Sequence, residues 1–266
     1  MPGVAITTLL LAGGVSIGVG LSFAAVARAV QRRPVAGGAA VALRAFGLWW
    51  ACMAAYLILY GTFTVMASYG TLAADFFLSA RVVTIPLLCV GVWGITSYLL
   101  YLYTGAAWVF RAVAAFYAAV AALFFWASFT GSNEMLVQRW IITTDDTSAA
   151  YRAVYFLVGL PPIAAAMAYF ALLRKVDERG QRYRIVLVSG SIFMWVASGL
   201  AARIAAHDAA IFVTLVLFGA LAGTASLMAY YPPRRVQAWL DEAPESRARR
   251  RAMLWQRQQQ RLGELL

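Results

Sequence analysis

Three arginines lie inside or at the edge of long apolar stretches: Arg81, Arg152 and Arg203. An ionisable side chain within the hydrocarbon layer of a membrane is costly, so its presence there indicates a function. Four aspartates fall near the same ends of the apolar stretches: Asp75, Asp145, Asp146 and Asp208. These groups could form ion pairs, or the arginines could hold a carboxylate or phosphate in a shallow polar pocket. The alternative is that the arginines extend to the membrane surface.

Two apolar stretches place a proline after an arginine: RVVTIPLL at residues 81–88, and YFLVGLPPI at residues 155–163. Proline removes a backbone donor and clashes with the preceding turn, so we expect a kink or an opening at Pro86, Pro161 and Pro162. Interrupted helices near mid-membrane are typical of transporter sites, and packing kinks are the other explanation. The predicted ligand-binding residues are Arg81, Pro86, Arg152, Tyr155, Pro161, Pro162 and Trp195.

The sequence lacks the residue patterns of common catalytic and metal sites. His207 is the single histidine, and Cys52 and Cys89 lie in apolar stretches without metal-ligand spacing. We find no Ser-His-Asp set, no HExxH motif and no glycine-rich phosphate loop. No acid lies at the centre of an apolar stretch, where a proton relay would need one. We therefore expect neither an enzyme nor a bound cofactor or metal.

Seven apolar segments must position these residues. The chain has 266 residues, of which 63% are hydrophobic and 12% charged, and its mean hydropathy is +0.74, as in integral membrane proteins. The segments are residues 4–29, 39–68, 74–103, 107–130, 149–173, 185–206 and 209–231. Each is long enough to cross a bilayer as a helix. The expected fold is an all-α integral membrane protein, with a seven-transmembrane helix bundle over residues 1–231 and a tail over 232–266.

Basic residues gather in alternate connections between these segments. They are frequent in the first and fifth connections and in the tail, and Arg111 follows the third, whereas the second, fourth and sixth connections hold few basic residues and several acids. By the positive-inside rule, this predicts an N-terminus outside, a cytoplasmic C-terminus and a multi-pass location in a bacterial inner membrane. The same distribution explains the net charge of +11 without a nucleic-acid partner.

The tail and the connections suggest further contacts. After Pro232 and Pro233, apolar residues among arginines indicate short amphipathic helices, and the arginines within 247–251 favour anionic lipid at the cytoplasmic face. Residues 131–148 are expected to form a short cap, with 145–148 capping the fifth segment. Small-residue runs at 13–20 and 219–226 indicate helix packing, either within the chain or in a homo-oligomer. Trp49 and Tyr230 lie near segment ends, where aromatic residues anchor helices at the membrane interface.

Two motifs resemble those of known families. YRAVYFLVGLPP, at residues 151–162, resembles the YRxVxWLxxxP string of microbial rhodopsins, in which an acid serves as counterion where Tyr155 stands here. A rhodopsin-like retinal Schiff base is excluded, because the one lysine, Lys175, is not in the last segment. RGQRYRIVLVSGSIF and YYPPRRVQAWL, at residues 179–193 and 230–240, resemble the seven-helix sensor modules found ahead of bacterial histidine kinases. This second resemblance implies a membrane sensor that signals to another protein.

The sequence therefore favours a non-enzymatic sensor-like or receptor-like module. It would bind a small or lipidic ligand from the outer side and relay the signal to a partner through the basic tail. One alternative is a structural or scaffold subunit of a membrane-protein complex or homo-oligomer. A transporter or channel is the third interpretation.

Overall fold

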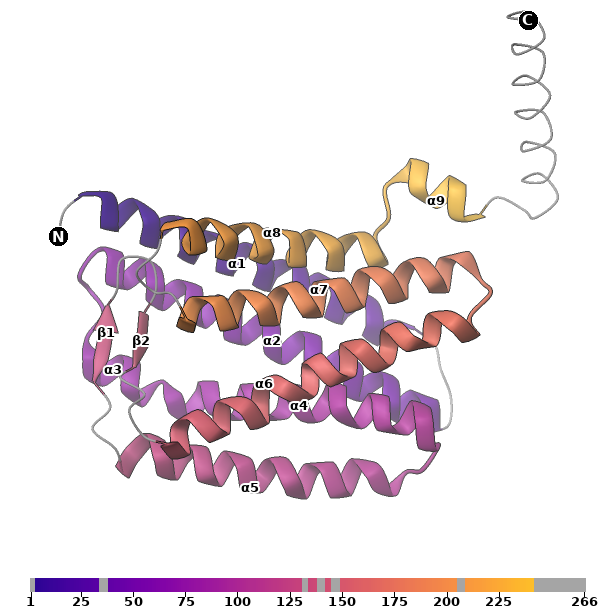
Figure 1. Ribbon diagram of the computed structural model, residues 1–266, viewed down its shortest axis with the longest axis horizontal. Coiled ribbons are helices and arrows are strands. Elements are labelled where there is room, and N and C mark those ends of the chain that lie inside the picture. The colour runs from indigo at the N-terminus through magenta and orange to yellow at the C-terminus, as the bar shows by residue number, and fades with distance from the viewer. Residues whose placement is uncertain are drawn as a thin grey trace, which may run out of the picture.

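Seven helices of 22 to 31 residues carry the apolar segments (Figure 1). The computed structural model describes residues 3–33, 38–130, 134–137, 142–144, 149–204 and 209–241. The long helices are α1 (Gly3–Gln31), α2 (Gly38–Ser68), α4 (Arg81–Thr104), α5 (Trp108–Thr130), α6 (Ala149–Ala171), α7 (Arg179–Ile204) and α8 (Ala209–Tyr230). The short elements are α3 (Ala74–Ser79), β1 (Met135–Val137), β2 (Ile142–Thr144), the 3-10 helix η1 (Leu172–Lys175) and α9 (Arg234–Asp241).

Six stretches of the described chain are helical, long and apolar enough to cross a membrane. They are Ile6–Gln31, Ala39–Ser68, Ala74–Thr104, Trp108–Thr130, Phe156–Lys175 and Phe212–Tyr230. Inside a bilayer, a helix satisfies all its backbone hydrogen bonds internally, which accounts for an almost entirely helical chain. The prediction of an all-α, multi-pass membrane protein is thus confirmed for these six helices. Helix α7 is not among them, and its first six residues include Arg179, Arg182 and Arg184.

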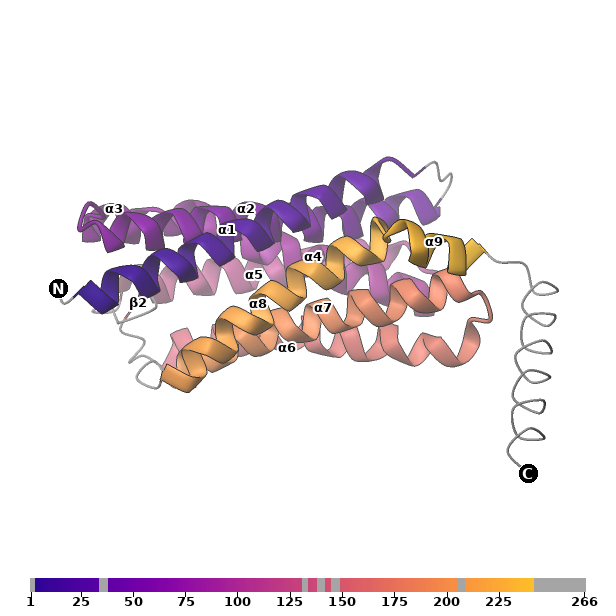
Figure 2. The same ribbon diagram turned by 90° about the horizontal axis from the view of Figure 1, so that it is seen from above.

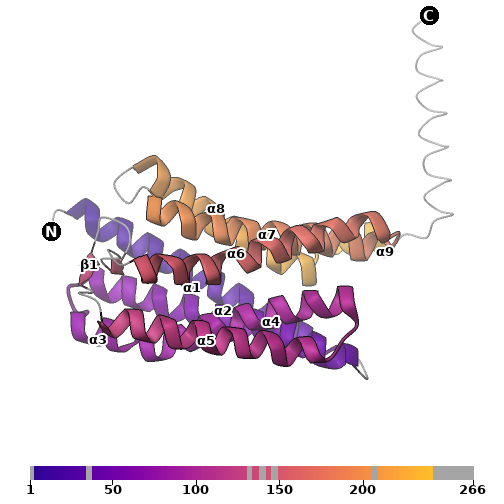
Figure 3. The same cartoon turned by 60° about the horizontal axis from the view of Figure 1, so that its bottom comes forward.

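The long helices run alternately up and down in two layers. Figure 3 shows α6, α7 and α8 as one layer over α1, α2, α4 and α5. Contacts between α1 and α8, α4 and α6, and α5 and α6 join the layers. Figure 2 shows that the N-terminus and the β1–β2 hairpin lie at one end of the bundle and α9 at the other. We call these the hairpin end and the tail end.

Glycines allow the closest approaches between helices. A Cβ added at Gly13 of α1 would lie 2.8 Å from the Gly61 carbonyl oxygen of α2, so only glycine fits at this contact. Gly223 of α8 also faces α1, but less closely, because a Cβ added there would lie 3.4 Å from Val19 and Ser22, in ordinary van der Waals contact. The small-residue runs on α1 and α8 are therefore used for packing within the chain, which lets the helix backbones approach closely.

The predicted third segment consists of two helices. It is divided at Ala80, between α3 and α4, and not at Pro86, which lies inside α4. Helix α3 is drawn onto α2 by aromatic contacts, with the Phe63 ring 5.8 Å from Phe76 and 5.9 Å from Phe77. Helix α6 likewise runs without interruption through Pro161 and Pro162. The predicted opening of these helices at their prolines is therefore not observed.

A two-stranded hairpin covers part of the hairpin end. Strands β1 and β2 pair antiparallel, with Leu136 opposite Thr143. The Tyr60 hydroxyl of α2 donates a hydrogen bond of 2.8 Å to the Ile142 carbonyl oxygen, and the Ile142 side chain is buried against α2. These contacts agree with the predicted cap. The proposed helix-capping residues 145–148 lie outside the described residues.

The chain leaves the bundle through Pro232 and Pro233. Proline cannot continue a helix but is tolerated in a first helical turn, so α8 ends at Tyr230 and α9 begins at Arg234. Arg234 and Arg235 are exposed, while Val236 and Leu240 are half-buried. The predicted amphipathic helix is thus confirmed for residues 234–241. The arginines within 247–251 lie outside the described residues.

Candidate functional site

Arg81, the deepest of the predicted ligand-binding arginines, has a structural contact. It is 7% exposed at the start of α4, and its Nη1 donates a hydrogen bond of 3.5 Å to the Ser128 carbonyl oxygen near the end of α5. The last carbonyl groups of a helix carry partial negative charge and lack helical donors, so a nearby cation stabilises them. Arg81 thereby joins α4 to the C-terminal end of α5.

Trp195 is half-buried and packs against the core of the bundle. Its ring packs edge-to-face on Trp49 of α2, with ring centroids 5.5 Å apart. The Trp49 ring lies beside Gly91, ten residues along α4 from Arg81, which corresponds to roughly 15 Å of helix. The structure therefore does not bring Trp195 together with Arg81.

The other predicted residues lie along α4 and α6. Pro162 is buried, and Pro86 and Pro161 are half-buried. Arg152 and Tyr155 lie in the first two turns of α6, and their side chains fall outside the described part of the structure. Within that part, no group of three or more histidine, cysteine, aspartate or glutamate residues could hold a metal ion.

A cluster of tyrosines and arginines lies at the tail end, and we call it the Arg–Tyr cluster. It consists of Arg33 after α1, Tyr98 of α4, Tyr169 of α6, Arg184 of α7 and Tyr230 of α8. The Tyr98 and Tyr169 rings are 6.4 Å apart, and the Arg33 guanidinium lies 5.2 Å from the centre of the Tyr230 ring. Both arginines interact electrostatically with the Tyr169 and Tyr230 hydroxyls. Five segments of the chain thus meet around two guanidinium groups.

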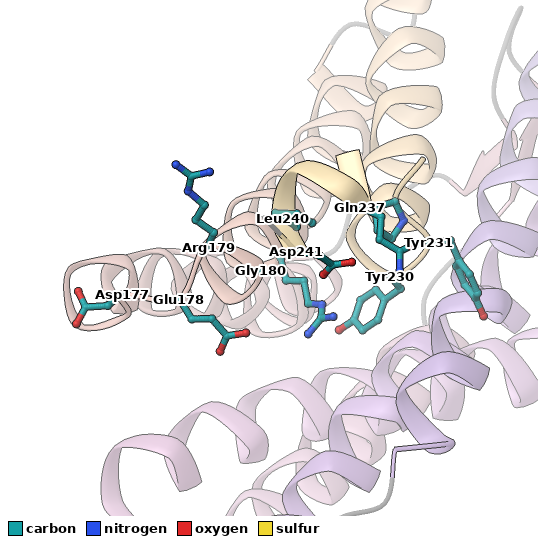
Figure 4. Close-up of a pocket in the computed structure, with 11 residues that line it drawn as sticks. Asp177, Glu178, Arg179, Gly180, Tyr230, Tyr231, Gln237, Leu240 and Asp241 are labelled. Atoms are coloured by element: carbon teal, nitrogen blue, oxygen red, sulfur yellow. The ribbon is translucent and has the colours of Figure 1, made fainter. Parts of the chain in front are cut away.

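A groove of about 720 Å³ opens beside this cluster, between α7, α8 and α9 (Figure 4). Its volume is within the range of small-molecule sites. It is lined by Asp177, Glu178, Arg179, Gly180, Arg184, Tyr230, Tyr231, Pro232, Gln237, Leu240 and Asp241. Figure 4 shows the Tyr230 hydroxyl and the Asp241 carboxylate directed towards the same space, with Asp177 and Glu178 farther away, in the connection that precedes α7. The groove therefore offers groups of both charges.

Two contacts hold the walls of the groove in place. The Arg179 guanidinium of α7 lies 4.8 Å from the centre of the Trp239 ring of α9, a cation–π contact. The Tyr231 hydroxyl donates a hydrogen bond of 3.2 Å to the Ala25 carbonyl oxygen of α1. The turn at Pro232 and Pro233 thus directs α9 back onto the start of α7.

The tail end is strongly basic. Its described cations are Arg28, Arg32, Arg33, Arg44, Arg111, Arg174, Lys175, Arg179, Arg182, Arg184, Arg234 and Arg235. Its described acids are Asp177, Glu178 and Asp241. Anionic groups are therefore favoured at this end.

Sequence reasoning missed the groove and the Arg–Tyr cluster. It interpreted the basic residues of the first and fifth connections, which include Arg33 and Arg184, only as signs of membrane orientation, and Tyr230 only as an interface anchor. The signal in the sequence was the gathering of basic residues beside tyrosines at the ends of several segments. The prediction for Trp49 is wrong, because this expected interface anchor is 1% exposed and belongs to the core.

Comparison with known proteins yields no match among family models, curated proteins or solved structures. The functional argument therefore rests on the geometry of the chain itself.

Proposed function

We propose that the protein is a seven-helix, sensor-like module of a bacterial inner membrane, with its tail end in the cytoplasm. In this proposal α7 is the seventh spanning helix, because it packs between α6 and α8 along the bundle. The basic tail end agrees with a cytoplasmic position under the positive-inside rule. The module would pass changes in bundle packing to a partner protein through α9 and the tail.

The observation that carries this proposal is the attachment of α9 to the bundle. The Arg179–Trp239 contact links α9 to α7, and the Tyr231–Ala25 hydrogen bond links the preceding turn to α1. A displacement of α7 would therefore also displace α9. Trp195, on the same helix, contacts Trp49 in the core and connects α7 to α2.

A small or lipidic ligand would act from the hairpin end. Its proposed contacts are Arg152, Tyr155, Pro161 and Pro162 of α6, with Pro86 of α4 and Trp195 of α7. Arg81 would support this region by holding α4 against α5 and would not contact the ligand directly. Movement of α6 or α7 on binding would reach the tail end through the helices themselves.

Hydrogen–deuterium exchange of residues 234–241, in the full chain reconstituted into nanodiscs, tests the relay. Trp195→Ala removes the contact between α7 and α2, and we expect severalfold faster exchange in α9 than in the unchanged protein. Trp126→Ala is the matched control, because Trp126 is 59% exposed on α5 and away from α7. Trp239→Ala removes the cation–π contact itself. The exchange rate of α9 in this variant is the fastest that loss of this contact can produce.

The relay is wrong if Trp195→Ala alters exchange within α7 but leaves α9 unchanged. Trp195→Phe, which keeps an aromatic ring, gives a second measurement if the alanine variant does not fold. A folded Trp195 variant that behaves like the Trp126 control would instead favour the structural-subunit interpretation.

A further inference from the structure

The inner part of the groove has donors for a phosphate group. Arg184 and Tyr230 line it together, and the Arg33 guanidinium packs on the Tyr230 ring. A guanidinium presents a planar set of N–H donors that fits phosphate oxygens, and a phenol hydroxyl can add another donor. Arg184 and Tyr230 could therefore contact the same phosphate.

Arg179 supports the groove at the start of α7. Its Nη1 is shielded from solvent and has no hydrogen-bond partner among the described residues. Its guanidinium lies over Trp239, which fixes its position without neutralising its charge. Figure 4 shows the Arg179 side chain directed away from Tyr230 and Asp241, so Arg179 supports the wall of the groove through Trp239 and does not contact the phosphate.

The groove also contains a carboxylate that a phosphate alone would not need. Asp241, at the end of α9, lines the same space as Arg184, and Figure 4 shows its carboxylate directed towards the Tyr230 hydroxyl side of the groove. A simple anion would be repelled by Asp241. A ligand that carries an ammonium group beside its phosphate would satisfy both charges.

The position of the groove favours a lipid as the source of this group. Tyr230 ends a helix that is long and apolar enough to cross a membrane. Helix α9, which forms another wall, is amphipathic and exposes Trp239 by 49%. Tryptophan beside arginines is typical of helices that lie in the headgroup layer.

We propose that this groove binds the phosphoethanolamine headgroup of a phospholipid in the adjoining leaflet. Arg184 and the Tyr230 hydroxyl bind the phosphate, Arg33 holds the Tyr230 ring, Arg179 holds α9 through Trp239, and Asp241 binds the ammonium. This site is separate from the ligand proposed at the hairpin end, and it does not depend on the relay.

Native mass spectrometry of the full chain, titrated with single phospholipids, tests the site. We expect phosphatidylethanolamine to bind more tightly than phosphatidylcholine, whose methylated ammonium has no N–H donor, and more tightly than phosphatidylglycerol, which has no ammonium. Arg184→Gln should weaken binding of all three lipids, and that of phosphatidylethanolamine by roughly tenfold. Asp241→Asn should lower the affinity for phosphatidylethanolamine to that for phosphatidylcholine.

Matched controls separate the site from general surface charge. Arg182→Gln removes an exposed arginine from the same turn of α7, outside the groove lining, and should leave all three affinities unchanged. Asp75→Asn removes an exposed acid at the hairpin end and should also have no effect. Arg184→Lys keeps the positive charge but loses the planar fork of donors, so it should lower the lipid affinity less than Arg184→Gln. It provides the second measurement if Arg184→Gln does not fold.

Three results would overturn the proposal. Equal affinity for the three lipids, or a preference for phosphatidylglycerol, would show that Asp241 does not select an ammonium. Equal effects of Arg184→Gln and Arg182→Gln would show only general charge attraction. Displacement of the lipid by an equal concentration of soluble phosphoethanolamine would show that the ligand is not a membrane lipid.

Discussion

At the scale of single residues, Arg81 shows how an arginine in an apolar segment can serve the fold. Its guanidinium meets the last turn of α5 and is almost fully buried. We expect Arg81→Ala to lower the free energy of unfolding by about 2 kcal/mol, the usual contribution of a hydrogen bond from a charged donor. Thermal unfolding in nanodiscs would show this as a lower midpoint. Arg111→Ala, at an exposed position of α5, should leave the midpoint unchanged.

The role proposed for Arg81 would be contradicted by an Arg81→Ala variant as stable as the unchanged protein. Arg81→Lys retains the charge but loses the planar fork of donors, so its midpoint should lie between the two. An Arg81→Ala variant that loses its response to the ligand but keeps its stability would instead support the predicted role of Arg81 in ligand binding.

Residue types alone predicted some roles correctly and others wrongly. Both Trp49 and Tyr230 were expected to be interface anchors, yet Trp49 lies ten residues inside its segment and is a core residue, and Tyr230 ends α8 and joins the Arg–Tyr cluster. The sequence shows how far a residue lies from the end of its own helix. It does not show which neighbouring helix covers that residue, and this decides whether an aromatic ring meets lipid, core or arginine.

At the scale of elements, hydropathy predicted the helices closely. The second and fourth segments, 39–68 and 107–130, differ by one residue from α2 and α5. The division at Ala80 was missed because α3 is as apolar as the helix that follows it. The packing of Phe76 and Phe77 on Phe63 accompanies the division, and that contact joins parts of the chain that hydropathy treats independently.

The contact between α2 and α4 can be tested through a glycine. A Cβ added at Gly94 of α4 would collide with the Ala45 carbonyl oxygen of α2, which is backbone and cannot move aside alone. We expect Gly94→Ala to lower the stability by about 1–3 kcal/mol, as overpacked cores do. Gly159→Ala is the control, because nothing lies within 4 Å of its added Cβ and alanine favours the helix. Equal unfolding midpoints in nanodiscs for both variants would show that α2 and α4 do not pack as described.

At the scale of the whole molecule, composition was enough to predict a helical membrane protein. It was not enough to predict the groove, because the Arg–Tyr cluster draws its residues from five separate segments. Charges in the connections were interpreted as a sum that sets orientation. Their three-dimensional arrangement also forms a cluster, since Arg33 and Arg184 approach the same tyrosines from different parts of the chain.

The proposed orientation of the whole bundle rests on the charges at its two ends and can be measured directly. Ser79 is exposed at the hairpin end and Gln181 at the tail end, while Cys52 and Cys89 are buried, so the unchanged chain serves as the unlabelled background. In intact bacterial cells stripped of their outer membrane, a membrane-impermeant maleimide should label Ser79→Cys and not Gln181→Cys, because the basic tail end is retained in the cytoplasm. Permeabilised cells should label both variants equally. The reverse pattern in intact cells would place the basic end outside, and the proposed relay to a cytoplasmic partner would then fail with it.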